Sequence, residues 1–248
     1  MAGYPEIDKA TDEAIRRLKE MLERNVARAL AMLQDESIRS MLARRGAAQL
    51  KEILGALGLD SVAAEYRDSF RRVAQTIGDT LELRGISAEA STVSVEAMQR
   101  FVNGSVGRLT QQFGEELPAA LGDIIEAGSQ TPAKLDVMIG DLSRQMQTTT
   151  VQAVVEADTR LMGFDRLVIT EQSVASGFEL FLYDGPDDGV IRPFCEEHVG
   201  KVWTLEELDA EDNGSNQPKP VSLFLGGYGC RHSLVAVTPE EAAAYGRR

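Results

Sequence analysis

The chain has 248 residues, and 43% of them are hydrophobic, which is enough to fill the core of one large domain or two ordinary ones and excludes a disordered protein. Its 26 basic and 39 acidic residues give a formal net charge of -13, which disfavours a general role in coating nucleic acid or anionic lipid. The sequence has no apolar run near the roughly 18 residues of a membrane helix, and its start lacks the basic-then-apolar order of a secretory signal. We therefore expect a protein that is made and kept in a cytoplasm, without a membrane span.

The first part of the chain, from about residue 8 to residue 162, carries apolar side chains at intervals of three and four, the spacing of amphipathic helices. We expect a helical bundle that buries these stripes, although the same stripes leave open an association with helices of a partner or of a second copy. Gly104 and Gly107 interrupt the third stripe and weaken the helical pattern there. The four stripes are Ile15, Leu18, Leu22, Val26, Leu30 and Leu33; Val62, Tyr66, Phe70, Val73, Ile77 and Leu81; Val95, Met98, Val102, Val106, Leu109 and Phe113; and Leu135, Met138, Leu142, Met146 and Val154.

Residues at the ends of these segments predict the helix boundaries. Thr11, followed by two acidic residues, is typical of a capped helix start. A shorter pair of helices is expected over 35–57, and Gly85 stands where the C-terminal cap of the next helix is expected. A further helix is expected over 115–127, and Thr131 followed by proline predicts the start of the last long helix.

The character of the sequence changes at Gly163, where the helical periodicity ends and short β-forming runs separated by turn residues begin. We therefore predict a helical domain over 1–162 and a small α+β domain over 163–248. The expected fold class is α+β, with a mainly helical N-terminal bundle followed by a small mixed α/β domain with short strands. Strands are expected at 167–173, 178–184, 221–225 and 234–237; a helical turn at 192–198; and capped helix starts at Thr204 and Thr238.

A basic stretch lies within this acidic chain, because residues 16–51 contain nine Lys or Arg against four acidic residues, a net charge of 9 − 4 = +5. Such a stretch is usually a solvated helix face whose charges pair at i,i+4. A weak contact with DNA stays open, and it would use Arg16, Arg17, Arg44 and Arg45.

The two cysteines and the two histidines of the chain lie close together in the sequence, in the pattern C-x2-H followed by C-x-H. Cys195, His198, Cys230 and His232 would supply two thiolates and two imidazoles, a ligand set that tetrahedral zinc accepts. Cys230 and His232 can bind one ion only if the residues around them lie in a bend, because a strand would send the two side chains to opposite faces. A structural zinc therefore stays open, as does a disulfide, but the favoured interpretation is two buried thiols with histidines hydrogen-bonded to backbone.

Catalysis by these residues has less support. A cysteine with a histidine within hydrogen-bond reach can act as a nucleophile, and Cys195 with His232 is one such pair. No oxyanion loop with a recognisable signature accompanies either cysteine. The sequence therefore predicts no active site, no catalytic residue and no cofactor beyond the zinc left open.

Taken together, the segments around the two cysteines resemble the C-terminal signature of the Mu F-like head morphogenesis family, the minor capsid proteins of tailed bacteriophages. That family shows a turn with Asp and Gly, then R-P-F-C, then G-K-V-aromatic-T, a loop rich in Asn and Gly, and G-G-Y-x-C-R-H before a short apolar strand. The resemblance covers only the C-terminal part of the chain. The matching positions are Arg192, Pro193, Phe194, Cys195, Gly200, Lys201, Val202, Trp203, Thr204, Asn213, Gly214, Gly226, Gly227, Tyr228, Cys230, Arg231 and His232.

The resemblance implies a structural role in the phage head, with the portal protein or the major capsid protein as partner, and help in head assembly, DNA packaging or ejection. It places the protein in the virion, after assembly in the host cytoplasm. In the family the position of His198 need not be histidine, which argues against a zinc with four protein ligands.

Four of the matching side chains have expected structural tasks. Arg192 and Arg231 are expected to hold the turns by binding carbonyls or the acidic turn 184–188, and Trp203 and Tyr228 to supply apolar contacts. Each of them also suits a surface that meets a partner protein. The alternative function is a thiol- or metal-dependent virion enzyme, a hydrolase or nuclease that uses the Cys/His cluster.

Overall fold

The computed structural model describes residues 4–38, 50, 53–83, 85–86, 92–128 and 135–246. The long helices are α1 (Pro5–Gln34), α4 (Leu59–Glu82), α5 (Thr92–Gln111), α6 (Leu117–Gly128) and α7 (Leu135–Ala175), and the π-helix η1 (Gln112–Glu116) joins α5 to α6. The elements that follow are β1 (Leu180–Asp184), α8 (Pro193–His198), β2 (Val202–Trp203), α9 (Leu205–Ala210), α10 (Val221–Phe224), β3 (Ser233–Val237) and α11 (Pro239–Ala244). The expected fold class, a mainly helical region followed by a small α/β region, is confirmed.

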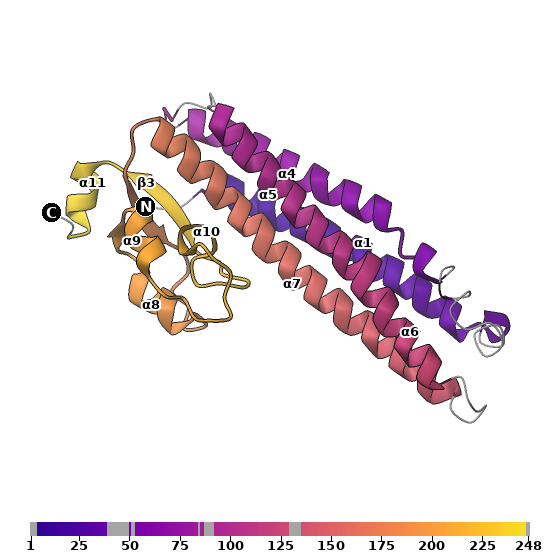
Figure 1. Cartoon of the computed structure of the whole chain (residues 1–248). Helices are drawn as coiled ribbons and strands as arrows, with labels where there is room; N and C mark the ends of the chain where they lie inside the picture. Colours follow the sequence, from indigo (N-terminus) through magenta and orange to yellow (C-terminus); the bar gives the residue numbers. More distant parts are fainter. Residues whose placement is uncertain are drawn as a thin grey trace. The chain divides into compact units, whose positions relative to one another are not determined.

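The described chain divides into two compact units, and the division falls inside α1, α4, α5 and α7. Unit 1 contains the described parts of Met1–Ile15, Ser69–Asn103 and Val155–Arg248, and unit 2 contains those of Arg16–Asp68 and Gly104–Val154. The described residues after α7, 176–246, are called the sheet region below. They belong to unit 1 together with the carboxyl-terminal part of α7, and Figure 1 shows β3 and α10 beside that part of the helix.

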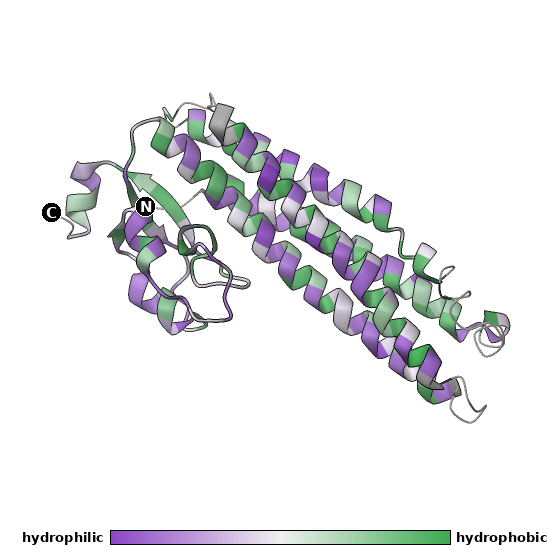
Figure 2. Cartoon of the chain, viewed as in Figure 1, coloured by the Kyte–Doolittle hydropathy of each residue, from purple (hydrophilic) through white to green (hydrophobic). Residues whose placement is uncertain are grey.

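The helical stripes predict most of the buried positions. All six residues of the second stripe, from Val62 to Leu81, are buried in α4, and Gly85 has the left-handed conformation (φ 74°) of a C-terminal cap. Figure 2 shows apolar and polar residues alternating at short intervals along the long helices. The prediction for α5 is wrong at Val95, which is 53% exposed, and right at Val106, which is buried.

The start of α1 differs from the prediction. The helix begins at Pro5, where proline costs no hydrogen bond, and Glu6 and Asp8 stand in its first turn. Thr11 is not a cap: it is buried in the helix, and its hydroxyl lies 3.5 Å from the carboxylate of Asp165 on α7. The buried side chain of Ile7 extends the apolar stripe by one turn beyond the predicted start, and this burial explains the longer helix.

Helix α7 continues through Gly163, so the prediction that the helix ends there is wrong, and so is the strand predicted at 167–173. Gly163 permits close packing instead, because a Cβ atom there would lie 2.8 Å from the ring of Phe224 in α10 and 3.3 Å from that of Phe101 in α5. Residues 163–170 are buried on all sides of the helix. A helix that is buried on all sides has no polar face, so its sequence lacks the 3.6-residue periodicity and resembles the apolar run of a buried strand. The domain boundary between residues 162 and 163 stays a prediction.

The sheet is antiparallel, with strand order β2-β1-β3. The central strand β1 pairs Phe181 with Trp203 of β2 and with Ala236 of β3. The strands predicted at 178–184 and 234–237 are confirmed, whereas 221–225 forms the short helix α10. The buried core of the sheet region consists of Phe181, Tyr183, Cys195, Leu208, Val221, Leu225, Cys230 and Leu234.

The capped helix starts are confirmed. Thr204 before α9 and Thr238 before α11 each accept a hydrogen bond from the backbone N–H three residues on, and a glutamate there returns a bond to the backbone of the threonine. The helical turn predicted at 192–198 is α8, with Pro193 at its first position. These local signals need no distant partner, which is why the sequence predicts them well.

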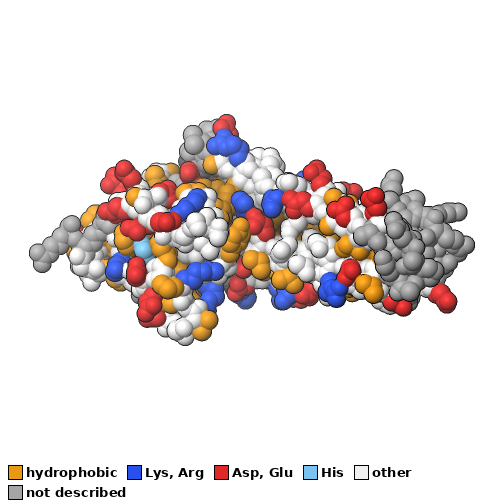
Figure 3. All heavy atoms as spheres, turned by 60° about the horizontal axis from the view of Figure 1, so that its bottom comes forward, with side chains coloured by type: hydrophobic (Ala, Val, Ile, Leu, Met, Phe, Trp, Pro, Cys, Tyr) orange, Lys and Arg blue, Asp and Glu red, His pale blue; other side chains and the backbone are white. Residues whose placement is uncertain are grey.

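Some predictions fall on residues that the structure does not describe: most of the helix pair at 35–57, and the start at Thr131. Among the described residues, no helix is long and apolar enough to cross a membrane, as expected. On the face drawn in Figure 3, acidic and basic side chains are interspersed rather than separated by sign.

Candidate metal centre

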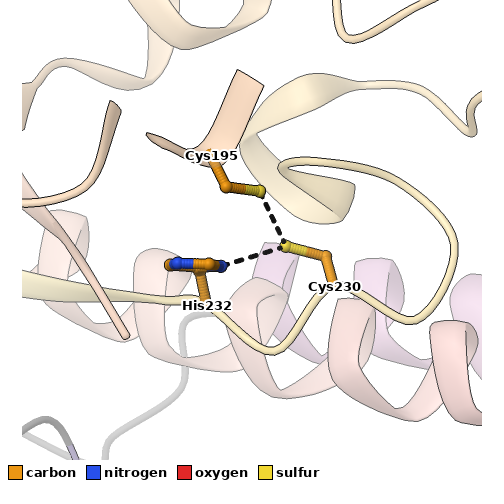
Figure 4. Close-up of side chains that lie close together, drawn as sticks. All are labelled: Cys195, Cys230 and His232. Carbon is orange, nitrogen blue, oxygen red and sulfur yellow. Dashed lines mark hydrogen bonds between the residues drawn. The ribbon is translucent and has the colours of Figure 1, made fainter. Parts of the chain in front are cut away.

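Three of the four predicted ligands meet in the core of the sheet region. Cys195 comes from α8, whereas Cys230 and His232 come from the segment between α10 and β3. The Cys195 and Cys230 sulfurs are 3.7 Å apart, and the Cys230 sulfur is 3.7 Å from Nδ1 of His232 (Figure 4). All three ligand atoms lie within 4.8 Å of one another, and each side chain is buried.

The backbone around Cys230 provides the bend that a shared site requires. Gly229 has a left-handed conformation (φ 62°), and β3 begins only at Ser233, so Cys230 and His232 do not lie on a regular strand. Both side chains therefore reach the same place from positions only two residues apart.

The fourth predicted ligand, His198, lies apart from this group. Its Nδ1 atom is 2.6 Å from the carbonyl oxygen of Phe194, and its ring stacks on Phe194 and Trp203 with centroid distances of 4.0 and 4.8 Å. Its Nε2 atom faces Glu211 at 3.9 Å. The structure therefore gives His198 a packing position in α8 and reduces the four-residue set to three.

Tyr183 is a member of the site that sequence reasoning missed. Its hydroxyl donates a hydrogen bond to the Cys195 sulfur at 3.3 Å and lies 4.0 Å from the Cys230 sulfur. Burial, more than any other cause, raises the pKa of this phenol, so the hydroxyl stays protonated and remains a donor. The sequence indicates this position only weakly: Tyr183 is two residues after the buried Phe181, so its side chain lies on the same inward face of β1 and places a hydroxyl in the core.

The two thiols titrate as a pair. The pKa of Cys230 is lowered, mainly because Cys195 donates a hydrogen bond to its sulfur, and His232 contributes a further bond. The pKa of Cys195 is raised, first by its bond to Cys230 and then by burial. Cys230 therefore ionises first, and the thiol of Cys195 keeps its proton and donates a hydrogen bond to the Cys230 thiolate.

Arg166 of α7 holds the segment that carries Cys230 and His232. The residue is only 1% exposed, and its guanidinium donates to the carbonyl oxygens of Cys230 at 2.7 Å, His232 at 2.6 and 3.0 Å, and Leu223 at 3.0 Å. A second contact from α7 comes from the hydroxyl of Thr159, which accepts a hydrogen bond from the N–H of Gly229 at 3.0 Å. The sequence signal for Arg166 is a charged pair, Asp165-Arg166, inside an apolar run.

Gly226 leaves room for the sulfur atoms. A Cβ atom at this position would lie 2.3 Å from the Cys195 sulfur and 3.4 Å from that of Cys230. Any other residue would push the backbone of the G-G-Y-x-C segment away from α8. This glycine is therefore required by close approach, whereas Gly227 has a left-handed backbone (φ 95°).

The remaining residues of the signature hold turns or lie at the surface. Arg231 binds both carboxylate oxygens of Asp188 at 2.8 and 2.9 Å, and Arg192 donates to the carbonyl of Tyr228. Gly200 donates its N–H to the carbonyl of Tyr183 at 2.8 Å, and Lys201 accepts from the N–H of Tyr183 at 2.9 Å.

The two aromatic side chains of the signature differ in their contacts. Trp203 packs against the core of the sheet region, as expected. Tyr228 is 38% exposed and does not pack against the core of the sheet region, so of its two expected tasks the exposure fits a surface position rather than an apolar contact. Its carbonyl, rather than its ring, takes part in holding the turn through Arg192.

A surface pocket of about 330 Å³ adjoins the Cys195 thiol. Its lining includes Cys195, His232, Arg192 and Arg231. Both arginines already donate to protein acceptors, Arg231 to Asp188 and Arg192 to the carbonyl of Tyr228, and the volume of the pocket is sufficient for water.

The basic stretch has ordinary pairing where it is described. Arg16 binds Glu20 at 2.9 Å and Lys19 lies 3.9 Å from Glu23, both at i,i+4 on α1 with exposed side chains. Arg44 and Arg45 lie outside the described residues. The described part therefore fits a solvated helix face.

Comparison of the chain with protein-family models, with curated proteins and with solved structures found no match.

Proposed function

We propose that the protein is a structural minor head protein of a tailed bacteriophage, which associates with the portal or the inner capsid wall and helps head assembly, DNA packaging or ejection. It would reside in the virion after assembly in the host cytoplasm. Its partners would be the portal protein or the major capsid protein, and its helices would also allow self-association.

One observation carries this proposal: the separate segments of the signature form one structural unit. Cys195 follows R-P-F in α8, Trp203 of the G-K-V-W-T segment pairs with β1, and Cys230 of the G-G-Y-G-C-R-H segment lies against Cys195. Segments that match a family pattern by chance would not be expected to meet around one core.

The tasks of the signature residues also favour a structural role. Arg231 binds Asp188, Thr204 caps α9, and Gly200 bonds to β1. Each of these contacts holds a turn or the end of a helix or strand. A signature made of such residues specifies a shape rather than a reaction.

The test is whether phage heads contain and need this protein. Deletion of the gene from the phage or prophage that carries it should lower the number of infectious particles, and mass spectrometry should find the protein in purified wild-type heads at low copy number. Complementation by Arg231→Asp should fail, because two carboxylates then face each other. The double variant Arg231→Asp with Asp188→Arg should restore function as a matched control. Heads that lack the protein, together with an unchanged titre after deletion, would contradict the proposal.

A second candidate function has one observation in its favour. A surface pocket is lined in part by the buried residues Cys195 and His232, which carry the thiol and the imidazole that a thiol- or metal-dependent hydrolase or nuclease would use. This candidate predicts turnover of DNA or cell-wall substrates by the purified chain, lost in Cys195→Ser. No turnover by the full-length protein, with or without added divalent metal, would count against it.

A further inference from the structure

We propose that Cys195, Cys230 and His232 bind one zinc ion, with the fourth position taken by water from the adjoining surface pocket. The ion would tie α8 to the segment before β3. This inference is independent of the proposed function, since a zinc of this kind would stabilise the sheet region whatever the protein does.

Two of the three distances between the ligand atoms match those of a tetrahedral zinc, and the third, between the Cys195 sulfur and a ring nitrogen of His232, is at most 4.8 Å. With Zn–S bonds of about 2.3 Å and a Zn–N bond of about 2.0 Å, two thiolates are about 3.8 Å apart and a thiolate and an imidazole nitrogen about 3.5 Å apart. The observed separations are 3.7 Å between the two sulfurs and 3.7 Å between the Cys230 sulfur and Nδ1 of His232. A disulfide needs sulfurs only about 2.05 Å apart. The structure thus has the spacing of a shared ligand site, not of a covalent bridge.

The choice of zinc follows from the donors. Two thiolates and one imidazole form a soft, mixed S and N set, which suits zinc better than magnesium or calcium, whose ligands are oxygen atoms. The two thiolate charges balance the charge of the ion, so the bound site carries no excess charge into the core.

The surroundings hold the ligands in place without the ion. Arg166 fixes the carbonyls of both Cys230 and His232, and the hydroxyl of Tyr183 donates to the Cys195 sulfur. Such outer contacts orient metal ligands and tune their affinity. Gly226 keeps the backbone close to the sulfurs without a side chain in the space between them.

The fourth position has a source of water. The surface pocket of about 330 Å³ is lined in part by Cys195 and His232, two of the three ligands. His198, the other candidate in the sequence, is held at Phe194 and Trp203 and does not take this position.

The first measurement uses the full-length chain, reduced, freed of metal and then supplied with zinc. We expect one zinc per chain by mass spectrometry of the metal, and protection of both cysteines from alkylation while zinc is bound. Replacement of zinc by cobalt should give the charge-transfer absorption of thiolate ligands, which reports on the wild-type protein and needs no variant to fold. Chelation should lower the unfolding temperature and shift the fluorescence of Trp203, the single tryptophan.

The ligand set is tested by substitution. Cys195→Ser, Cys230→Ser and His232→Gln should each lower zinc affinity more than tenfold, whereas His198→Gln, the matched control, should retain it. Circular dichroism checks that each variant folds. The proposal is overturned if the reduced wild-type chain shows no thiolate-to-cobalt band and equal alkylation with and without zinc, if His198→Gln loses the metal as His232→Gln does, or if the protein carries a Cys195–Cys230 disulfide and binds no zinc after reduction.

Discussion

Arg166 of α7 donates hydrogen bonds to three carbonyl groups of the sheet region. A buried guanidinium is costly to desolvate, and it is tolerated when its donors are satisfied. Here three carbonyl groups accept from it: that of Leu223 in the short helix α10, and those of Cys230 and His232 in the irregular segment before β3. The guanidinium therefore satisfies buried carbonyl groups that, in a longer strand, would accept hydrogen bonds from the backbone of a neighbouring strand.

Replacement of Arg166 by alanine should lower the free energy of unfolding of unit 1 by at least about 3 kcal/mol, because three buried carbonyls lose their donor. Arg166→Lys should recover only part of this loss, since one ammonium cannot reproduce the planar fork. Urea unfolding followed through Trp203 reports on the sheet region, and circular dichroism reports on the helices.

The matched control for this prediction is Arg16→Ala, which removes an exposed arginine paired with Glu20 and should change stability little. If the Trp203 transition of Arg166→Ala coincides with that of the wild type, the three hydrogen bonds do not hold the sheet region in place.

At the scale of elements, α7 shows what the sequence can and cannot predict. Stripes with one apolar face, such as that of α4, are visible in the sequence, and so are capping boxes like that of Thr204. The failures, 167–173 and 221–225, are short apolar runs that are largely buried, where the period of the pattern no longer separates helix from strand. The contacts that decide them, such as Phe224 on Gly163, join residues far apart in the chain.

The candidate site follows the same division. Cys195, Cys230 and His232 could be grouped from the sequence because chemistry restricts metal ligands to a few residue types. Tyr183 and Arg166 could not, because a tyrosine in a strand and an arginine in a helix have many roles. Proximity in the sequence groups His198 with the ligands, but its position in α8 directs its ring to Phe194 and Trp203.

Two glycine substitutions should have opposite effects on the helices. Gly163→Ala should lower the free energy of unfolding by about 1–3 kcal/mol, because the new Cβ would lie 2.8 Å from the buried ring of Phe224. Gly104→Ala in α5 should raise it by about 0.5–1 kcal/mol, since no atom lies within 4 Å of the new Cβ and alanine favours the helix. Thermal unfolding of both variants measures the difference. A gain in stability for Gly163→Ala would show that Phe224 does not pack closely on α7.

For the whole molecule, buried acidic groups set the response to pH. Asp165 is fully buried, and desolvation raises its pKa from 3.8 to about 7, with the nearby Asp8 of α1 adding to the rise and Arg166 opposing it. Desolvation also raises the pKa of Asp158, which is half-buried, and of Asp8, whose side chain is exposed but lies near other carboxylates. A carboxyl whose pKa is higher in the folded state than in the unfolded chain keeps its proton on folding, so it favours the fold at low pH.

The free energy of unfolding that Asp165 contributes therefore changes with pH in the opposite direction to that of an ordinary salt-bridged aspartate. Between pH 3.8 and about 7 the folded state holds more protons than the unfolded chain, so the free energy of unfolding falls as the pH rises through this window. Above it, the fold contains a buried carboxylate whose second oxygen has no hydrogen-bond partner among the described residues. At about 1.4 kcal/mol per pKa unit, the contribution is on the order of a few kcal/mol.

Asp165→Asn removes this titration and keeps the shape of the side chain. Relative to the wild type, the variant should gain stability as the pH rises from 5 to 8, because only the wild type then buries a charge. Urea unfolding of both proteins across this range isolates Asp165, since Asp8 and Asp158 remain in each. Asp123→Asn on α6, an exposed carboxylate, serves as the control and should follow the wild-type curve. If the stability curves of Asp165→Asn and the wild type run parallel from pH 5 to 8, Asp165 is ionised in the folded protein throughout this range. Arg166 then stabilises the buried carboxylate, and the pKa of Asp165 is not raised as we expect.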